Sequence, residues 1–179
     1  MLDHLGGLVV SVRPAVAADV PVLLQLVREL AEYEREPDAV EATEPMLTEA
    51  LFGASPVASC HVAQDGGQVV GFALWYVTFS TWTGRPGLWL EDLFVRPGAR
   101  GTGLGRALLS ALAAVCVERG YGRFEWWVLD WNTPAHGFYR ALGADPQDGW
   151  TTWRVDGAAL RTLAGARVED IAPDEAAKG

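Results

Sequence analysis

Hydrophobic positions near the start of the chain recur at helical spacing. Apolar residues three or four positions apart line one face of a helix, and the segment after Asp19 keeps this spacing. Its apolar members are Val22, Leu23, Leu26, Val27, Leu30 and Ala31. Asp19 is a candidate N-cap, and Pro37 cannot continue a helix. The pattern therefore predicts a helix from Asp19 to Tyr33 or Glu34.

Further segments along the chain also favour helices, the last of them short. Thr43 is a candidate cap for the first segment, while Gly120 and Gly143 follow the next two, where glycine commonly closes a helix. The predicted helices are Glu44–Phe52, Arg106–Arg119, Pro134–Leu142 and Gly157–Leu163.

Short runs rich in β-branched and aromatic residues predict the strands. They are Leu8–Arg13, Ala58–Ala63, Val69–Phe79, Gly87–Val95, Phe124–Leu129 and Trp150–Val155. The turn at 65–67, Asp-Gly-Gly, suits a hairpin. The order of elements predicts an α/β fold with a mixed, mostly antiparallel sheet, in which a meander is followed by a β-α-β crossover.

The domain organisation follows from the chain length and from the absence of repeats and long linkers. A chain of 179 residues fits one domain, and neither an internal repeat nor a long linker divides it. We expect a single domain over residues 8–165, between a flexible N-terminus (1–7) and a C-terminal tail (166–179). The N-terminus has no basic segment followed by an apolar run, so no signal peptide is expected. No stretch has the apolar length of a membrane span.

Composition narrows the possible partners. The net charge is −9, from 14 basic and 23 acidic residues, with a pI near 4.7, which disfavours nucleic acid and anionic membranes as partners. Acidity permits a cationic partner, but it also simply confers solubility. The two cysteines, Cys60 and Cys116, stand far apart, so a reducing, cytoplasmic location is expected. The three histidines lack metal-ligand spacing, and no metal is expected.

A glycine-rich turn, Arg100-Gly-Thr-Gly-Leu-Gly105, lies between a predicted strand and a predicted helix. Glycines allow backbone N–H groups to converge on an anion, and a helix N-terminus adds its positive dipole end. The turn could hold a pyrophosphate, although such glycines are often only structural. A P-loop is excluded because no lysine follows Gly105, and the G-x-G-x-G spacing departs from that of a dinucleotide fold.

A third pattern, [Arg/Gln]-x-x-Gly-x-[Gly/Ala], matches Arg100, Gly103 and Gly105. It resembles the coenzyme-A loop of the GNAT superfamily of N-acetyltransferases. The strings at 89–95, 128–132 and 138–144 resemble the diamine (spermidine/spermine) N1-acetyltransferases and the related thialysine Nε-acetyltransferases. The resemblance runs from about Val10 to Leu163. It implies a central mixed sheet with helices on both faces, acetyl-CoA as co-substrate, a small cationic amine as acceptor and a homodimer.

The resemblance also implies roles in acetyl transfer. Glu91 is the proposed base, acting directly or through water, and Asp92 follows it. Since adjacent strand residues face opposite sides, only one of the two should face the acetyl centre. Tyr139 is the proposed acid for the leaving thiolate, because a phenol stays protonated at neutral pH. Without these roles, Glu91 would be an ordinary exposed acid and Tyr139 a tyrosine that packs a helix face. Asn132 could hold the pantetheine arm, cap a helix or do both.

The remaining implied site residues fall into two sets. The cofactor-binding set is Leu93, Phe94, Val95, Arg100, Gly101, Thr102, Gly103, Leu104, Gly105, Arg106, Asn132 and Tyr139. The substrate-binding set is Tyr33, Glu34, Trp82, Glu91 and Asp92, since carboxylates and aromatic faces suit an ammonium group. Ser80 departs from the polyamine enzymes, which carry an acid there, and favours a shorter, lysine-like amine. A protein lysine acetyltransferase and a catalytically silent coenzyme-A sensor are the alternatives.

Overall fold

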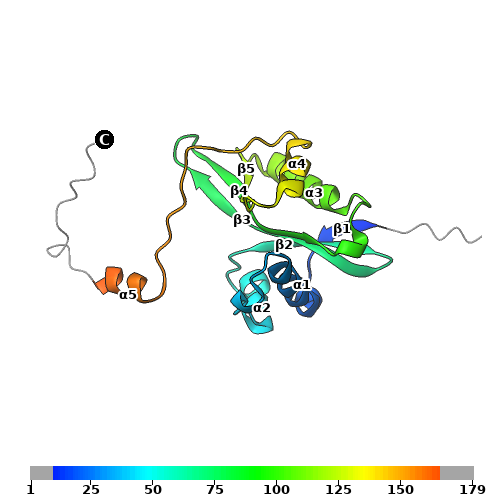
Figure 1. Cartoon of the computed structure of the whole chain (residues 1–179), viewed down its shortest axis with the longest axis horizontal. Helices are drawn as coiled ribbons and strands as arrows, with labels where there is room; N and C mark the ends of the chain where they lie inside the picture. Colours follow the sequence, from blue (N-terminus) through cyan, green and yellow to red (C-terminus); the bar gives the residue numbers. More distant parts are fainter. Residues whose placement is uncertain (1–9, 166–179) are drawn as a thin grey trace, which may run out of the picture. The chain divides into compact units, whose positions relative to one another are not determined.

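The computed structural model describes residues 10–165, and a five-stranded sheet forms its centre (Figure 1). The strands follow one another across the sheet in chain order, from β1 to β5. They are β1 (Ser11–Pro14), β2 (Ser59–Asp65), β3 (Gln68–Ser80), β4 (Arg85–Val95) and β5 (Phe124–Trp126). The first four pair antiparallel, and β5 pairs parallel with β4. The predicted fold class, a meander followed by a β-α-β crossover, is confirmed.

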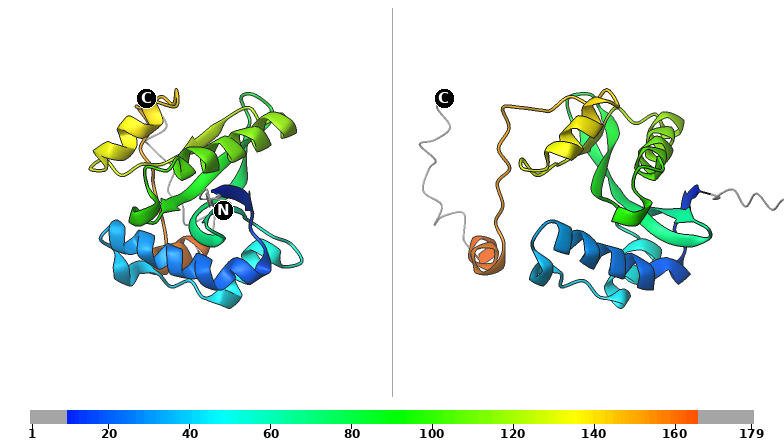
Figure 2. Two further views of the ribbon diagram at one scale, coloured as in Figure 1. Left: turned by 90° about the vertical axis from the view of Figure 1, so that its right-hand side faces the viewer. Right: turned by 45° about the vertical axis from the view of Figure 1, so that its right-hand side comes forward.

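Helices α1, α2 and α3 cover the two faces of the sheet. Figure 2 shows α1 (Val20–Tyr33) and α2 (Glu44–Phe52) on one face and α3 (Leu104–Arg119) on the other. We call these the α1 face and the α3 face. Two short 3-10 turns, Ala17–Asp19 and Pro37–Ala39, flank α1, and a third, Pro97–Ala99, precedes α3.

The core on the α1 face follows from the predicted helical pattern. The buried cluster there joins α1 and α2 to alternate residues of β2, β3 and β4: Leu23, Leu26, Leu30, Leu51, Cys60, Val62, Phe72 and Phe94. Helix α3 buries Leu108 and Leu112 completely. Burying these aliphatic and aromatic side chains fixes the sheet between its two helical layers.

Asp19 precedes α1 as predicted, but its side chain does not cap that helix. Its carboxylate accepts hydrogen bonds from the Arg13 guanidinium at 2.7 and 2.9 Å and from the Val16 N–H at 2.8 Å. The buried carboxylate therefore ties β1 to the 3-10 turn before α1. This ion pair lowers the pKa of Asp19.

Contacts divide the chain into two units, residues 1–129 and 130–179, which are described separately. The second unit contains α4 (Thr133–Arg140) and α5 (Gly157–Gly165). The strand predicted at 150–155 is wrong, since this segment has no secondary structure and no partner strand among the described residues. A strand needs a ladder of hydrogen bonds, and Trp150 and Trp153 are 80% and 91% exposed.

Other element ends differ by a few residues from those predicted. Strand β5 ends at Trp126 rather than Leu129, because its parallel ladder with β4 stops there. Helix α3 begins at Leu104, directly after the glycine turn, rather than at Arg106. Residues 1–7 and 166–179 lie outside the described residues, and a single domain over 8–165 stays a prediction. No helix within residues 10–165 is long and apolar enough to cross a membrane.

Candidate active site

A β-bulge in β4 brings two acidic side chains to one face of the sheet. Leu74 of β3 lies opposite Asp92, and the next residue, Trp75, lies opposite Leu90, so Glu91 has no partner on β3. Tyr76 lies opposite Trp89, and the Trp89 indole N–H donates to Glu91 Oε2 at 3.2 Å. Since Leu74 and Tyr76 share a face of β3, Asp92, Trp89 and Glu91 also share one.

The shared face corrects one sequence prediction. Strict alternation would put Glu91 and Asp92 on opposite sides of the sheet, but an extra residue in one strand breaks the alternation at that point. Asp92 lies on the α1 face, because Phe94, two residues further, belongs to the core cluster there. Glu91 and Asp92 therefore act on the same side of the sheet.

Two neighbouring carboxylates act on Asp92 at this bulge. Burial, the charge of Glu91 and the charge of Glu34 raise the pKa of Asp92 to about 6. Glu34 directly follows α1, and partial burial raises its pKa. Neighbouring carboxylates resist being ionised at the same time, because their negative charges repel each other. A cation placed among them would relieve that repulsion. We call Glu34, Glu91 and Asp92 the acidic corner.

The aromatic members of the predicted amine pocket lie in different places. Tyr33 ends α1 beside Glu34, and its ring lies under the Arg100 guanidinium at 4.9 Å. Trp82 is 88% exposed in the turn that joins β3 to β4. Glu91 stands six residues along β4 from Arg85, about 20 Å away at the usual strand rise. The structure thus brings Tyr33 to the acidic corner through Glu34, and places Trp82 at the far end of the hairpin.

Ser80 serves the same hairpin turn. Its side chain is buried, its hydroxyl accepts the N–H of Thr83 at 3.3 Å, and its carbonyl accepts the N–H of Gly84 at 2.8 Å. Ser80 therefore stabilises the turn that carries Trp82 and contributes no charge.

The glycine turn has the backbone geometry expected of an anion site. Gly101 and Gly103 have φ of +80° and +89°, which L side chains rarely adopt, and a Cβ at either would meet nothing within 4 Å. The Thr102 hydroxyl donates to the Ala99 carbonyl at 2.7 Å, which closes the turn. Gly103 precedes α3 directly, with Leu104 buried beneath it. The open space and the N-terminus of a long helix fit a pyrophosphate, so these residues suit the diphosphate of acetyl-CoA.

The Arg100 side chain points toward β4 and α1. Its Nε donates to the Val95 carbonyl at 2.8 Å, and its guanidinium stacks on Phe94 at 5.6 Å as well as on Tyr33. Arg106, in the first turn of α3, is exposed. Arg100 thus joins the glycine turn to the end of α1.

The end of β4 offers unpaired backbone on one edge. Strand β5 pairs only with residues 88–90 of β4, so Leu93, Phe94 and Val95 have no β5 partner among the described residues. On the other edge, β3 packs closely, since a Cβ on Gly71 would lie 2.7 Å from the Phe94 carbonyl oxygen. Successive N–H groups of a strand point to opposite edges, and the Arg96 N–H donates to the Val70 carbonyl of β3 at 2.9 Å. The N–H groups of Leu93 and Val95 therefore point toward the β5 edge, and that of Phe94 points toward β3.

Two predicted residues lie in the second unit. Asn132 precedes α4, but its side chain does not cap the helix, so the capping alternative is wrong. Its carbonyl accepts the N–H groups of Ala135 and His136 at 3.0 and 3.2 Å. Tyr139 lies within α4 beside Phe138, and burial raises the pKa of its phenol to about 12. Tyr139 therefore carries its proton at neutral pH.

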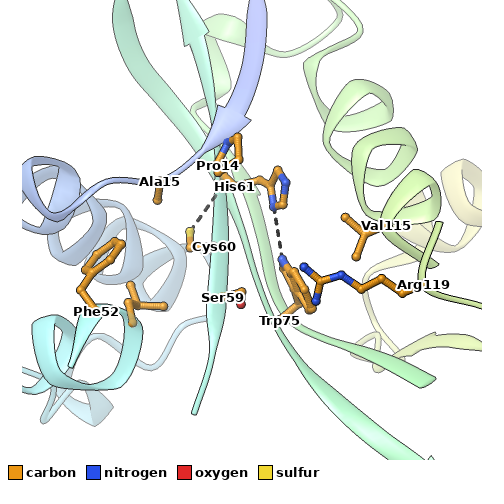
Figure 3. A pocket seen from close by; sticks show the side chains of 10 residues that line it. Pro14, Ala15, Phe52, Ser59, Cys60, His61, Trp75, Val115 and Arg119 are labelled. Atoms are coloured by element: carbon orange, nitrogen blue, oxygen red, sulfur yellow. Dashed lines mark hydrogen bonds between the residues drawn. The ribbon is translucent and has the colours of Figure 1, made fainter. Parts of the chain in front are cut away.

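A pocket of about 270 Å³ lies elsewhere in the first unit, between α2, β2 and α3 (Figure 3). Its polar lining includes Cys60, His61, Trp75 and Arg119, none of them a predicted site residue. The Trp75 indole donates to His61 Nδ1 at 3.2 Å, while burial and Arg119 lower the pKa of His61. His61 is thus a neutral, buried acceptor. Among residues 10–165, no group of acids, histidines or cysteines could hold a metal.

Comparison with known proteins identifies the family of the chain. The chain matches the acetyltransferase (GNAT) family over residues 23–144. It is 39% identical over 167 residues to thialysine N-epsilon-acetyltransferase of Sus scrofa, covering 87% of this chain and 98% of that protein. It is 32% identical over 164 residues to spermidine/spermine N(1)-acetyltransferase-like protein 1 of Homo sapiens, covering 86% of this chain and 24% of that protein.

A solved structure gives the same result for the fold. An integron cassette protein from the mobile metagenome of V. cholerae superposes with a TM-score of 0.75 at 26% identity, covering 89% of this chain and 100% of that one. The chain therefore belongs to the acetyltransferase (GNAT) family. It is an acetyltransferase enzyme, and the resemblance found in the sequence is confirmed.

Proposed function

We propose that the enzyme transfers an acetyl group from acetyl-CoA to a primary amine of a small cationic molecule, by direct attack in a ternary complex. The observation that carries this proposal is the acidic corner, where the charges of Glu91, at the bulge of β4, and Glu34, at the end of α1, act on Asp92. A small ammonium ion is the ligand that such a group of carboxylates would bind most favourably. The names of the thialysine and spermidine/spermine relatives support the same acceptor class.

The amine must lose a proton before it attacks. A lysine-type amine has a pKa of roughly 10.4, so about one molecule in a thousand is ready at neutral pH. We assign Glu91 as the acceptor of this proton, directly or through one water, and Asp92 with Glu34 as partners for the cation. The amine nitrogen then bonds to the thioester carbonyl carbon, whose oxygen gains charge. The segment Leu93, Phe94 and Val95 is assigned to coenzyme A, and the N–H groups of Leu93 and Val95, which point to the β5 edge, are assigned to the oxyanion and the pantetheine arm.

The carbon–sulfur bond then breaks, and the leaving thiolate takes a proton. We assign Tyr139 as the donor, supported by the burial that keeps its phenol protonated. Asn132 is assigned to the pantetheine arm. The diphosphate is assigned to the turn of Arg100, Gly101, Thr102, Gly103, Leu104 and Gly105, with Arg106 beside it.

The acceptor proposed is a lysine-like amine rather than a long polyamine. Ser80 supplies no carboxylate at the hairpin turn, so a second distant ammonium group would find no acid there. Homodimerisation and a cytoplasmic location are proposed on family resemblance and cysteine usage.

The decisive experiment measures thiol release from acetyl-CoA over a panel of thialysine, lysine, diamines, spermidine and amino sugars. We expect the highest kcat/KM with thialysine or lysine. Transfer to peptides but not to free amines would instead indicate a protein acetyltransferase, and acetyl-CoA binding without turnover would indicate a sensor. In the same assay Tyr139→Phe should lower kcat about 100-fold while leaving acetyl-CoA affinity within about twofold. Unchanged kcat would remove Tyr139 as the acid.

A further inference from the structure

The position of Glu91 in the sheet is unusual for a reactive side chain. It is the extra residue of the bulge, without a partner on β3, and it directly follows Leu90, where the parallel pairing with β5 ends. Neither neighbouring strand therefore fixes its backbone through a regular ladder. Its side chain is also exposed, so packing alone does not hold the carboxylate in one orientation.

Two neighbouring side chains supply what the ladder lacks. The Trp89 indole N–H donates to Glu91 Oε2 at 3.2 Å. Tyr76 lies opposite Trp89 on the same face, and burial, the charge of Glu91 and a hydrogen bond to Glu91 raise the pKa of the Tyr76 phenol. The indole and the phenol thus both direct donors at one carboxylate. Both groups keep their protons at neutral pH, so each can donate to an ionised carboxylate, which only accepts.

The Trp89 indole packs against Trp127, the residue that follows β5. The rings of Trp89 and Trp127 meet edge to face, with centroids 4.9 Å apart and an interplanar angle of 81°. Trp127 directly follows β5, at the point where β4 and β5 diverge. An edge-to-face pair of this kind is favourable beyond its buried area, so it orients the indole ring that in turn orients Glu91.

We propose that Tyr76 and Trp89 are positioning residues that hold the Glu91 carboxylate beside Asp92, so that both acids face the amine. The expected effect on catalysis rests on the proposed function. The positioning itself concerns only the distance between the Glu91 and Asp92 carboxylates. Without the two donors, the exposed carboxylate is free to turn into solvent, away from Asp92.

The pKa of Asp92 depends on its distance from the Glu91 carboxylate, because the charge of Glu91 raises it. The titratable groups that act on it or face it are Glu91 on β4, Glu34 after α1, and the Cys60 thiol of β2, whose pKa burial raises to about 12. Glu91 is the first of the two charges that raise the pKa of Asp92. A Glu91 carboxylate that turns away should therefore let the pKa of Asp92 fall, whereas a loss of packing elsewhere should leave it unchanged.

The test titrates the Asp92 carboxyl carbon by NMR in the full chain, with the signal identified by its loss in Asp92→Asn. Glu91→Gln removes the Glu91 charge and should therefore give the largest downward shift of the Asp92 midpoint. Trp89→Phe and Tyr76→Phe should each lower the Asp92 midpoint by about 0.5 pH unit or less, and the double variant should approach Glu91→Gln. Each single variant should also lower kcat roughly tenfold, with a smaller change in the amine KM.

Two matched variants remove the same groups elsewhere. Tyr121→Phe removes a hydroxyl that accepts from Arg119 at 3.4 Å, and Trp75→Phe removes an indole that donates to His61. Both should leave the Asp92 midpoint unchanged.

An Asp92 midpoint that stays fixed in Trp89→Phe and Tyr76→Phe, while it moves in Glu91→Gln, would overturn the inference. A midpoint that moves as expected while the amine panel shows no turnover would uphold the positioning and reject the proposed function. The two failures are thus distinguishable, because the titration needs neither acetyl-CoA nor an amine.

Discussion

The glycine turn and the acidic corner are built in opposite ways. The turn works through its backbone: Gly101 and Gly103 adopt positive φ, and nothing lies within 4 Å of where their side chains would begin. The acidic corner works through side chains from β4 and from the residue that follows α1, and it depends on a single extra residue in β4.

This difference decides how each region responds to change. A backbone site depends on which residues can adopt its dihedral angles, so one substitution should affect anion binding and leave the amine site intact. A side-chain site depends on the distance between charges, so a change of one atom should alter proton transfer and leave acetyl-CoA binding intact. The following variants test this independence.

Glu91→Gln should have the largest effect on turnover. It keeps the shape of the side chain but removes the proton acceptor, so kcat should fall about 100- to 1,000-fold. Acetyl-CoA affinity, measured by calorimetry, should stay within about twofold. Glu118→Gln, an exposed acid on α3, serves as the control and should change neither quantity. A kcat within about threefold of the native enzyme would remove Glu91 as the base.

Gly103→Val should give the converse result. Its φ of +89° strains a β-branched residue, and its side chain would enter the open space assigned to the diphosphate. We expect acetyl-CoA affinity to fall about 100-fold and the fold to lose about 1–2 kcal/mol. Gly98→Val, in the 3-10 turn just before, also has nothing within 4 Å but lacks a positive φ, and it should lose much less. Equal affinities for the two variants would reject the loop assignment.

Asp92→Asn should weaken amine binding and stabilise the fold. The pKa of Asp92 is raised to about 6, so folding takes up a proton between about pH 4 and 6, and the folded chain loses stability as pH rises through that window. The neutral amide avoids this loss. We expect a gain of about 1–2 kcal/mol at pH 7.5 that disappears below about pH 4, and an amine KM about tenfold higher.

Urea unfolding at several pH values measures the stability of Asp92→Asn, and Asp145→Asn, an exposed acid, is its control. A gain that is the same at pH 4 and pH 7.5 would show that ionisation of Asp92 is not its cause.

Arg100→Lys should have the smallest effect and the most mixed one, because Arg100 belongs to the glycine turn and stacks on Tyr33, the residue before Glu34. A lysine keeps the charge but loses the planar group that stacks on Tyr33 and Phe94. We expect the KM values for acetyl-CoA and for the amine each to rise about three- to fivefold. Tyr33→Leu should raise the amine KM similarly, and the double variant should add little to either. A change confined to the acetyl-CoA KM would assign Arg100 to direct phosphate contact alone.

Much of the glycine turn could be predicted from the sequence because its chemistry is local. Gly103 precedes α3 as the pattern requires, and the strand–turn–helix order is the one predicted. The same locality explains the success with α1 and α2, whose ends lie within a residue of those predicted.

The acidic corner could be recognised only in its members, not in its geometry. Period-2 alternation gives no sign of an extra residue, so the bulge at Glu91 and the donors from Tyr76 and Trp89 were missed. A lone glycine within a strand, Gly71, was the available signal for the close approach of β3 to the end of β4. The predicted strand at 150–155 failed for a related reason, since residue types favour a strand but a partner strand must complete it.

At position 92, substitutions that raise thermal stability should lower activity toward cationic amines. Any variant library screened only for survival on heating at neutral pH should enrich uncharged residues there, because each removes a half-buried charge that opposes folding. The same variants should lose their preference for cationic acceptors. A screen for a more robust enzyme would therefore need to hold Asp92 constant and seek its gains elsewhere in the chain.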